Sequence, residues 1–191
     1  GARSTEDQEH RIFASSLDCP VGMKNPTHGS LKIAVNSILA AQHPHYIVFD
    51  GYEVKTAGNK YAHLVLRGSN DSSNYGVEYI AEVNELFKKN QVVNPAIIVD
   101  VSHDNCVIDG VKDHNEQANI VLRVMDSLKE KPELKNLVKG FMLESFIKEG
   151  RQNAESGNPI DMSGLSITDP CLSWESTAKL ILEVAKQHAK G

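Results

Sequence analysis

Residues 97–103, Ile-Ile-Val-Asp-Val-Ser-His, form an apolar run of strand length that stops on an imidazole. Two other segments have the same form. Pro-Val-Gly-Met-Lys-Asn at residues 20–25 stops on Lys24, and Gly-Phe-Met-Leu-Glu-Ser at residues 140–145 stops on Glu144. In a parallel β/α sheet, buried strands deliver catalytic side chains to the carboxyl edge of the sheet. The three segments therefore predict a parallel α/β fold with an active site at that edge.

The composition narrows the class of protein. A chain of 191 residues can bury a sizeable single core, so one domain is expected. The net charge is −5 and the Lys and Arg residues are scattered, so no nucleic-acid partner is expected. Cys19, Cys106 and Cys171 lie far apart, which predicts neither a disulfide framework nor a cysteine zinc site. No apolar stretch approaches a membrane span and residues 1–11 do not resemble a signal peptide, so we expect a soluble, cytoplasmic protein without a membrane partner.

The first half of the chain alternates helical and strand patterns. Residues 4–11 lead into a short helix, which precedes a strand at 20–23. Apolar residues then recur at helical spacing from Leu31 to Leu39, and Tyr-Ile-Val-Phe at 46–49 is the next compact apolar run. Two β/α units with strands at 20–23 and 46–49 are therefore predicted.

The pattern changes after this second predicted strand. Residues 53–56 and 62–66 lie on either side of Gly58-Asn59, which favours a tight turn. These residues predict a small hairpin, inserted in the parallel fold, with Arg67 at its far end.

The β/α alternation continues in the second half. Apolar periodicity predicts helices at 77–87 and 118–128, and strands at 96–101 and 137–143. Residues 150–164 are rich in Gly, Asn, Ser and Pro and predict a long loop of the kind that often carries function. A last helix is expected to begin near Ser173, and we expect its inner face to hold four apolar residues, Leu180, Ile181, Val184 and Ala185.

His103, Glu144 and Asp169 are potential metal ligands, which we call the candidate metal triad. An imidazole and two carboxylates suit a divalent ion such as Mn, Fe, Co or Zn. Each residue has a plainer interpretation, because His103 could be a hydrogen-bonded loop residue, Glu144 an ion-pair partner and Asp169 a turn former or helix cap. The joint interpretation is favoured because two of the three end predicted parallel strands.

Three cations could meet at the same edge. Lys24 and Arg67 lie at predicted strand ends, and Arg3 lies in a Gly-Ala-Arg segment that could end a preceding strand. Arg offers a bidentate fork and Lys a point charge, so together they would bind a phosphorylated or carboxylated substrate. The alternative is a set of solvated surface cations.

Several motifs, in chain order, resemble those of the class I DAHP synthases (3-deoxy-7-phosphoheptulonate synthases). The resemblance covers essentially the whole chain, with Gly-Ala-Arg-Ser-Thr-Glu (1–6), Cys-Pro-Val-Gly-Met-Lys-Asn (19–25), Leu-Arg-Gly (66–68), Ser-His-Asp-Asn (102–105), Glu144-Ser145 and Ser-Ile-Thr-Asp (166–169). It implies a TIM barrel that condenses phosphoenolpyruvate with erythrose 4-phosphate to give DAHP and phosphate. This metal-dependent reaction is the first step of the shikimate pathway.

The resemblance also implies roles for single residues. Arg3 and Arg67 would hold the phosphate of phosphoenolpyruvate, and Lys24 would be the catalytic residue beside its carboxylate and reacting carbons. The candidate metal triad would bind the divalent metal. Two motifs of the family do not occur here, a Gly-Pro-Cys-Ser type segment whose cysteine is a further ligand and a Lys-Pro-Arg-Thr type segment that handles both substrates. The three cysteines of this chain lie in other motifs.

Placed on the barrel by this resemblance, residues 1–191 correspond to the C-terminal half, strands 5 to 8 with the end of strand 4. Such a half-barrel has two unpaired strand edges and an exposed inner face, so we expect it to pair with a second copy or with the missing N-terminal half, and to be inactive alone. One alternative is a non-catalytic half-barrel module that retains a phosphate-anion site. Another is the related synthase of an eight-carbon sugar acid, although Ser-Ile-Thr-Asp and Leu-Arg-Gly fit DAHP synthase better.

Overall fold

The central sheet is four-stranded and parallel. In the computed structural model, which describes residues 6–155, 157 and 159–189, its strands are β1 (Gly22–Lys24), β4 (His63–Leu66), β5 (Ile97–Asp100) and β8 (Val138–Met142). They lie in the order β1-β4-β5-β8, and every neighbouring pair is parallel. The predicted α/β fold with about four parallel units is confirmed.

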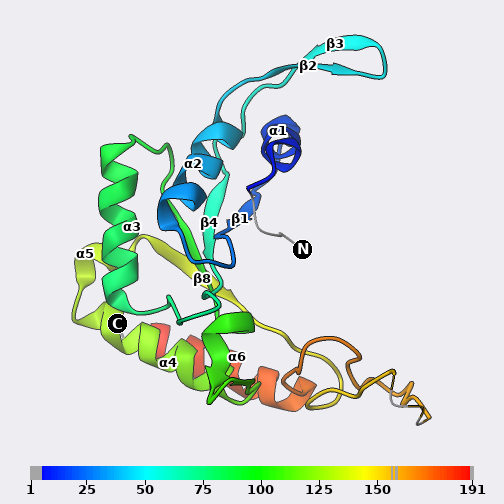
Figure 1. Cartoon of the computed structure of the whole chain (residues 1–191). Coiled ribbons are helices and arrows are strands. Elements are labelled where there is room, and N and C mark those ends of the chain that lie inside the picture. Colours follow the sequence, from blue (N-terminus) through cyan, green and yellow to red (C-terminus); the bar gives the residue numbers. More distant parts are fainter. Residues whose placement is uncertain (1–5, 156, 158, 190–191) are drawn as a thin grey trace.

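Helices connect the successive strands (Figure 1). The chain runs through α1 (Gln8–Ser16) before β1, α2 (Leu31–Gln42) before β4, α3 (Val77–Lys89) before β5, α4 (Glu116–Lys129) and α5 (Pro132–Lys135) before β8, and finally α6 (Trp174–His188). Ser30 and Ser173 cap α2 and α6, because each side-chain oxygen accepts a hydrogen bond from the backbone N–H three residues on. Among the described helices, none is both long and apolar enough to cross a membrane.

The core lies between the sheet and these helices. Its fully buried side chains come from both layers and include Leu64, Ile97, Val99, Ile38, Ile80, Val83 and Ile120. Removing each such side chain from water stabilises the fold by about 1.5–3 kcal/mol. The packing therefore holds the four strand ends, where the site lies, in fixed positions.

The hairpin lies earlier in the chain than predicted. β2 (Tyr46–Phe49) is antiparallel to β3 (Tyr52–Lys55) and is not part of the parallel sheet. Asp50 and Gly51 form the turn with φ of 50° and 78°. Asp-Gly is a pair favoured in type I′ hairpin turns, which need positive φ at both positions. A four-residue apolar run has the same pattern in a hairpin as in a buried strand, so the prediction of a sheet strand at 46–49 was wrong.

Residues 62–66, predicted as part of the hairpin, instead supply β4 of the parallel sheet. Gly58 and Asn59 anchor the chain just before it. A Cβ on Gly58 would clash with the carbonyl oxygen of Gln42. The Asn59 Nδ2 donates to the carbonyl oxygens of Ala14 and Cys19, at 3.1 and 2.8 Å. Gly58 and Asn59 therefore pack closely against Gln42, Ala14 and Cys19 and do not form a hairpin turn.

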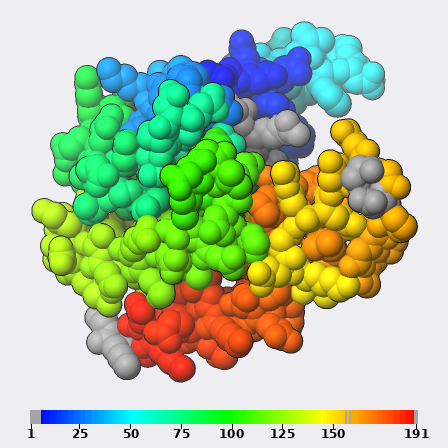
Figure 2. All heavy atoms as spheres, turned by 60° about the horizontal axis from the view of Figure 1, so that its bottom comes forward, coloured from blue at the N-terminus to red at the C-terminus, as the bar shows by residue number. Residues whose placement is uncertain are grey.

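The hairpin of β2 and β3 projects from the body of the molecule (Figures 1 and 2). Four of its apolar or aromatic side chains, Tyr46, Val48, Phe49 and Tyr52, are each at least 67% exposed. The hairpin thus presents a cluster of exposed apolar and aromatic side chains.

The inner face of α6 differs from the prediction. Leu180 is buried and Val184 packs against the core, as expected, but Ile181 is 60% exposed and Ala185 is also exposed. Successive helical residues are about 100° apart, so a position next to an inward side chain faces outward. Trp174, at the start of α6, is also exposed.

Candidate active site

The carboxyl ends of the parallel strands bring the predicted site residues to one edge of the sheet. Lys24 is the last residue of β1, Arg67 directly follows β4, and Glu144 lies just beyond β8. The chain after β5 enters the 3₁₀ turn η1 (His103–Cys106), which begins with His103. Arg3 lies outside the described residues.

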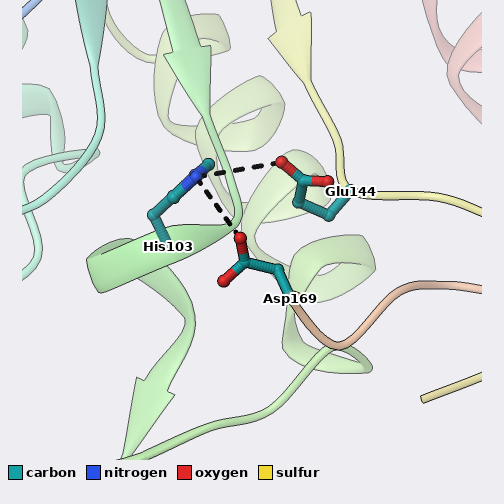
Figure 3. A group of neighbouring side chains, drawn as sticks. All are labelled: His103, Glu144 and Asp169. Atoms are coloured by element: carbon teal, nitrogen blue, oxygen red, sulfur yellow. Dashed lines mark ion pairs between the residues drawn. The ribbon is translucent and has the colours of Figure 1, made fainter. Parts of the chain in front are cut away.

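The candidate metal triad is assembled, with its side chains pointing toward one another (Figure 3). His103 Nε2 lies 3.8 Å from Glu144 Oε1 and 4.0 Å from Asp169 Oδ2. One ligand atom of each residue lies within 4.8 Å of the other two. Two atoms that bind one metal ion at about 2.1 Å are separated by about 3 to 4 Å. The two separations from His103 lie at the upper end of this range, so the three residues form a group of donors suited to one divalent ion.

Asp100 links the metal triad to the lysine at the end of β1. Its Oδ2 lies 2.7 Å from Lys24 Nζ and 2.9 Å from His103 Nδ1, and its Oδ1 accepts hydrogen bonds from the backbone N–H and hydroxyl of Ser102. When the imidazole proton is on Nδ1, facing this carboxylate, the lone pair of Nε2 points toward Glu144 and Asp169. This is the tautomer that metal binding requires. One buried carboxylate thus orients two functional side chains.

The charge of Asp100 is maintained by these partners. Burial alone would raise its pKa, but hydrogen bonds from His103, Lys24 and Ser102 outweigh burial and lower the pKa to about 2. The sequence did contain a signal for this residue, because Asp100 interrupts the apolar run of β5. The strand-end pattern predicts His103, a commoner metal ligand, and not Asp100.

Arg67 carries an unsatisfied buried donor. Its Nη1 lies 2.8 Å from Asp104 Oδ2, but the alignment is not that of a hydrogen bond, and this buried nitrogen has no hydrogen-bond partner among the described residues. The backbone N–H of Asp104 also donates to the Arg67 carbonyl oxygen at 3.3 Å. The Arg67 guanidinium is thus paired with the Asp104 carboxylate, and its planar fork is of the kind that binds phosphate groups.

Three buried asparagines, Asn25, Asn74 and Asn105, join the ends of β1, β4 and β5. The Asn25 Oδ1 accepts hydrogen bonds from the Arg67 N–H at 2.9 Å and from Asn74 Nδ2 at 3.1 Å. The Asn105 Oδ1 accepts from the Asn74 N–H at 2.8 Å. The network holds the backbone of Arg67, directly after β4. Composition and periodicity did not reveal it, because its bonds join segments far apart in the chain.

The backbone of Gly68 is also part of this asparagine network. Its N–H donates to Asn74 Oδ1 at 2.8 Å, and its carbonyl oxygen accepts from Asn25 Nδ2 at 2.9 Å. Its φ is +81°, and a Cβ would lie 2.6 Å from the backbone nitrogen of Asn105. Only glycine fits beside Arg67 at this position.

Asn74→Ala is expected to destabilise the protein by roughly 1–3 kcal/mol, because the buried N–H of Gly68 loses its acceptor. Urea unfolding followed by circular dichroism measures the change. Asn119→Ala is the matched control, since this exposed side chain bonds only Glu116 on its own helix, and we expect a change within about 0.5 kcal/mol. Equal stabilities of the two variants would show that the network does not hold the strand ends.

Asp169 has a second partner that the sequence did not indicate. Lys112 lies in a short antiparallel pair, β6 (Val107–Ile108) and β7 (Val111–Lys112), and its Nζ is 2.7 Å from Asp169 Oδ1. Burial would raise the pKa of Asp169, but the hydrogen bond and charge of Lys112, with the charge of His103, lower it.

The loop between β8 and α6 forms a lobe next to the triad, drawn yellow to orange in Figure 2. Its described residues have no helix or long strand, as predicted, and isolated bridges join Gly150 to Cys171 and Arg151 to Ser166. A cavity of about 440 Å³ beside Glu144 is lined largely by this loop. The loop therefore offers space for a small molecule directly next to a triad member.

Comparisons with known proteins agree with this geometry. Residues 1–182 match the model of the DAHP synthetase I family. The Trp-sensitive phospho-2-dehydro-3-deoxyheptonate aldolase of Enterobacter agglomerans is 36% identical over 97% of this chain and 52% of its own length. The Phe-sensitive enzyme of Escherichia coli K12 is 38% identical over 97% of this chain and 51% of its own length.

A solved structure of the same type is similar in fold. The phospho-2-dehydro-3-deoxyheptonate aldolase of Francisella tularensis superposes with a TM-score of 0.82 at 31% identity, over 98% of this chain and 53% of that one. The chain thus spans about half the length of the relatives it matches, and its four β/α units are half of a TIM barrel. The chain belongs to the DAHP synthetase I family.

Proposed function

We propose that this chain supplies part of the active site of a DAHP synthase, which condenses phosphoenolpyruvate with erythrose 4-phosphate to DAHP and phosphate. The observation that carries the proposal is the meeting of the metal triad, Lys24 and Arg67 at one edge of the sheet. Family membership and the names of the relatives support the same reaction. The reaction would place this protein at the first step of the shikimate pathway.

His103, Glu144 and Asp169 would hold the divalent metal, which is Mn, Fe, Co or Zn. When bound, the metal would act as a Lewis acid on the aldehyde oxygen of erythrose 4-phosphate. Asp100 and the Ser102 hydroxyl, at 2.9 and 2.7 Å from His103 Nδ1, would keep His103 in the tautomer that binds the metal.

The cations would bind phosphoenolpyruvate. Arg67, which directly follows β4, would bind its phosphate together with Arg3. Lys24, fixed by Asp100 at 2.7 Å, would lie beside the carboxylate and the reacting carbons and would stabilise the negative charge there. Each cation would thus hold a different part of the substrate.

We further propose that the four parallel strands correspond to strands 5 to 8 of a complete barrel, and that the chain alone is inactive. β1 and β8 stand at the edges of the sheet, where unpaired backbone groups favour a further strand. The exposed apolar residues of the β2–β3 hairpin and of α6 also favour contact with more protein, either the missing half or a second copy.

The alternative is a non-catalytic half-barrel module that keeps the phosphate-anion site. Arg67 favours it, because this cation lies within the chain itself, directly after β4, and needs no second half to be present. Binding of phosphoenolpyruvate without turnover would distinguish this module from an enzyme.

Two assays test the proposed function. Calorimetry should detect phosphoenolpyruvate binding to the chain with MnCl2 present, and Arg67→Ala should weaken it at least about 10-fold because a charged hydrogen bond is worth roughly 1.5–3 kcal/mol. Arg123→Ala, which removes an exposed guanidinium outside the site, should bind normally. The second assay measures phosphate release by the chain and by a chimera with the N-terminal half of the Escherichia coli Phe-sensitive relative.

We expect turnover by the chimera only, and none after Lys24→Met. A folded chimera that binds phosphoenolpyruvate but releases no phosphate would favour the binding module. Absence of phosphoenolpyruvate binding by both the chain and the chimera would contradict both proposals.

A further inference from the structure

The two carboxylate oxygens of Asp169 face different partners. Oδ1 accepts a hydrogen bond from Lys112 Nζ at 2.7 Å, whereas Oδ2 faces His103 Nε2 at 4.0 Å. The ammonium therefore lies against the oxygen that does not face the centre of the triad. Lys112 and Asp169 are both about one-third exposed, so the pair is partly shielded from water.

The β6–β7 pair, which carries Lys112, contacts η1, which begins with His103. β6 begins directly after η1, and the Asp113 N–H at the end of β7 donates to the Cys106 carbonyl oxygen at 2.9 Å. The Cys106 thiol in turn donates to the His103 carbonyl oxygen at 3.4 Å. A movement of the β7 backbone relative to η1 would break these hydrogen bonds.

Asp169, by contrast, lies in the loop that precedes α6. It comes between Ser166 and Cys171, whose bridges join them to Arg151 and Gly150. Asp169 does not follow a strand of the parallel sheet, whereas His103 and Glu144 lie within three residues of the ends of β5 and β8. The Lys112 ion pair thus connects the loop that carries Asp169 to the β6–β7 pair that follows η1.

We propose that Lys112 is a positioning residue that makes Asp169 a one-oxygen metal ligand. By holding Oδ1, it directs Oδ2 toward the site that His103 and Glu144 share. The inference rests on the metal site of the proposed function. Hydrogen-bonded partners of metal ligands orient them, and their loss commonly lowers metal affinity about 10–100-fold.

The sign of the effect separates positioning from simple electrostatics. An ammonium next to a dication repels it, so removing the charge of Lys112 would by itself strengthen metal binding. If the lysine instead orients Asp169, its removal weakens binding. The two explanations predict opposite changes for the same substitution.

Calorimetric titration of MnCl2 into the full chain tests this. We expect Lys112→Met to lower Mn²⁺ affinity about 10–100-fold, and Lys112→Arg, which keeps a cationic donor, to restore most of it. Lys148→Met is the matched control, because Lys148 makes an ion pair of the same 2.7 Å length with Asp161, which is not a member of the triad. Its affinity should equal that of the unchanged chain. Thermal unfolding without metal verifies that all variants fold.

Each outcome decides a different point. Mn²⁺ binding by Lys112→Met that is equal to or tighter than that of the unchanged chain would overturn the positioning role while leaving the metal site in place. An unchanged chain that binds no Mn²⁺ would overturn the metal site, and the role of Lys112 with it.

Discussion

His103→Ala is expected to lower the affinity of the chain for Mn²⁺ by more than about 100-fold. The imidazole supplies the only nitrogen of the triad, and its Nε2 faces both carboxylates, at 3.8 and 4.0 Å. Loss of a group that merely orients a ligand costs about 10–100-fold, so loss of the ligand itself costs more. Calorimetric titration with MnCl2, after removal of bound metal with a chelator, measures the affinity.

The control for this prediction is another histidine. His10 is exposed on α1, on a different element from the triad, and His10→Ala should bind Mn²⁺ as the unchanged chain does. Glu144→Gln gives a second test, because it keeps the size of the side chain and removes its charge. Affinities that are the same in all of these proteins would mean that Mn²⁺ binds elsewhere.

Asp100→Ala is expected to destabilise the fold by about 3–5 kcal/mol. The carboxylate is fully buried and is shared by Lys24, His103 and Ser102. Removing one partner of a buried ion pair lowers the free energy of unfolding by this amount, because the remaining charge stays buried and poorly solvated. Urea unfolding of the metal-free chain measures the difference in the free energy of unfolding.

A double variant separates this cause from a simple loss of packing. Asp100→Leu combined with Lys24→Met removes both charges, and we expect it to be less destabilising than Asp100→Leu alone. Asp126→Ala is the exposed counterpart, because Asp126 pairs with Lys129 at the same 2.7 Å on the surface of α4, and it should cost less than about 1 kcal/mol. A double variant at least as unstable as the single one would contradict the buried-pair explanation.

The sequence predicted the strand ends well because each is marked by a local signal. An apolar run that stops on Lys24 or Glu144 shows both where a buried strand ends and which side chain stands there. Parallel pairing then brings those ends together without further information. The proximity of His103 and Glu144 followed from this rule, whereas Asp169 lies in the loop before α6.

One feature that the sequence analysis missed depends on a local turn, and the others depend on contacts between distant segments. Residues 46–49 read as a buried strand, but Asp50-Gly51 turns them into an exposed hairpin. Lys112 and Asp169 are 57 positions apart, and no periodicity indicates that they meet. Asp100 was present in the pattern, but its role becomes visible only when Lys24 and His103 lie on either side of it.

Anomalous X-ray diffraction from crystals of the chain soaked in MnCl2 tests the metal site most directly. We predict one strong anomalous peak within about 2.3 Å of His103 Nε2, Glu144 Oε1 and Asp169 Oδ2, the range of distances for such ligands. A peak elsewhere, or no peak among these atoms when the soaked protein is saturated with Mn²⁺, would contradict the assignment of the triad as the metal site.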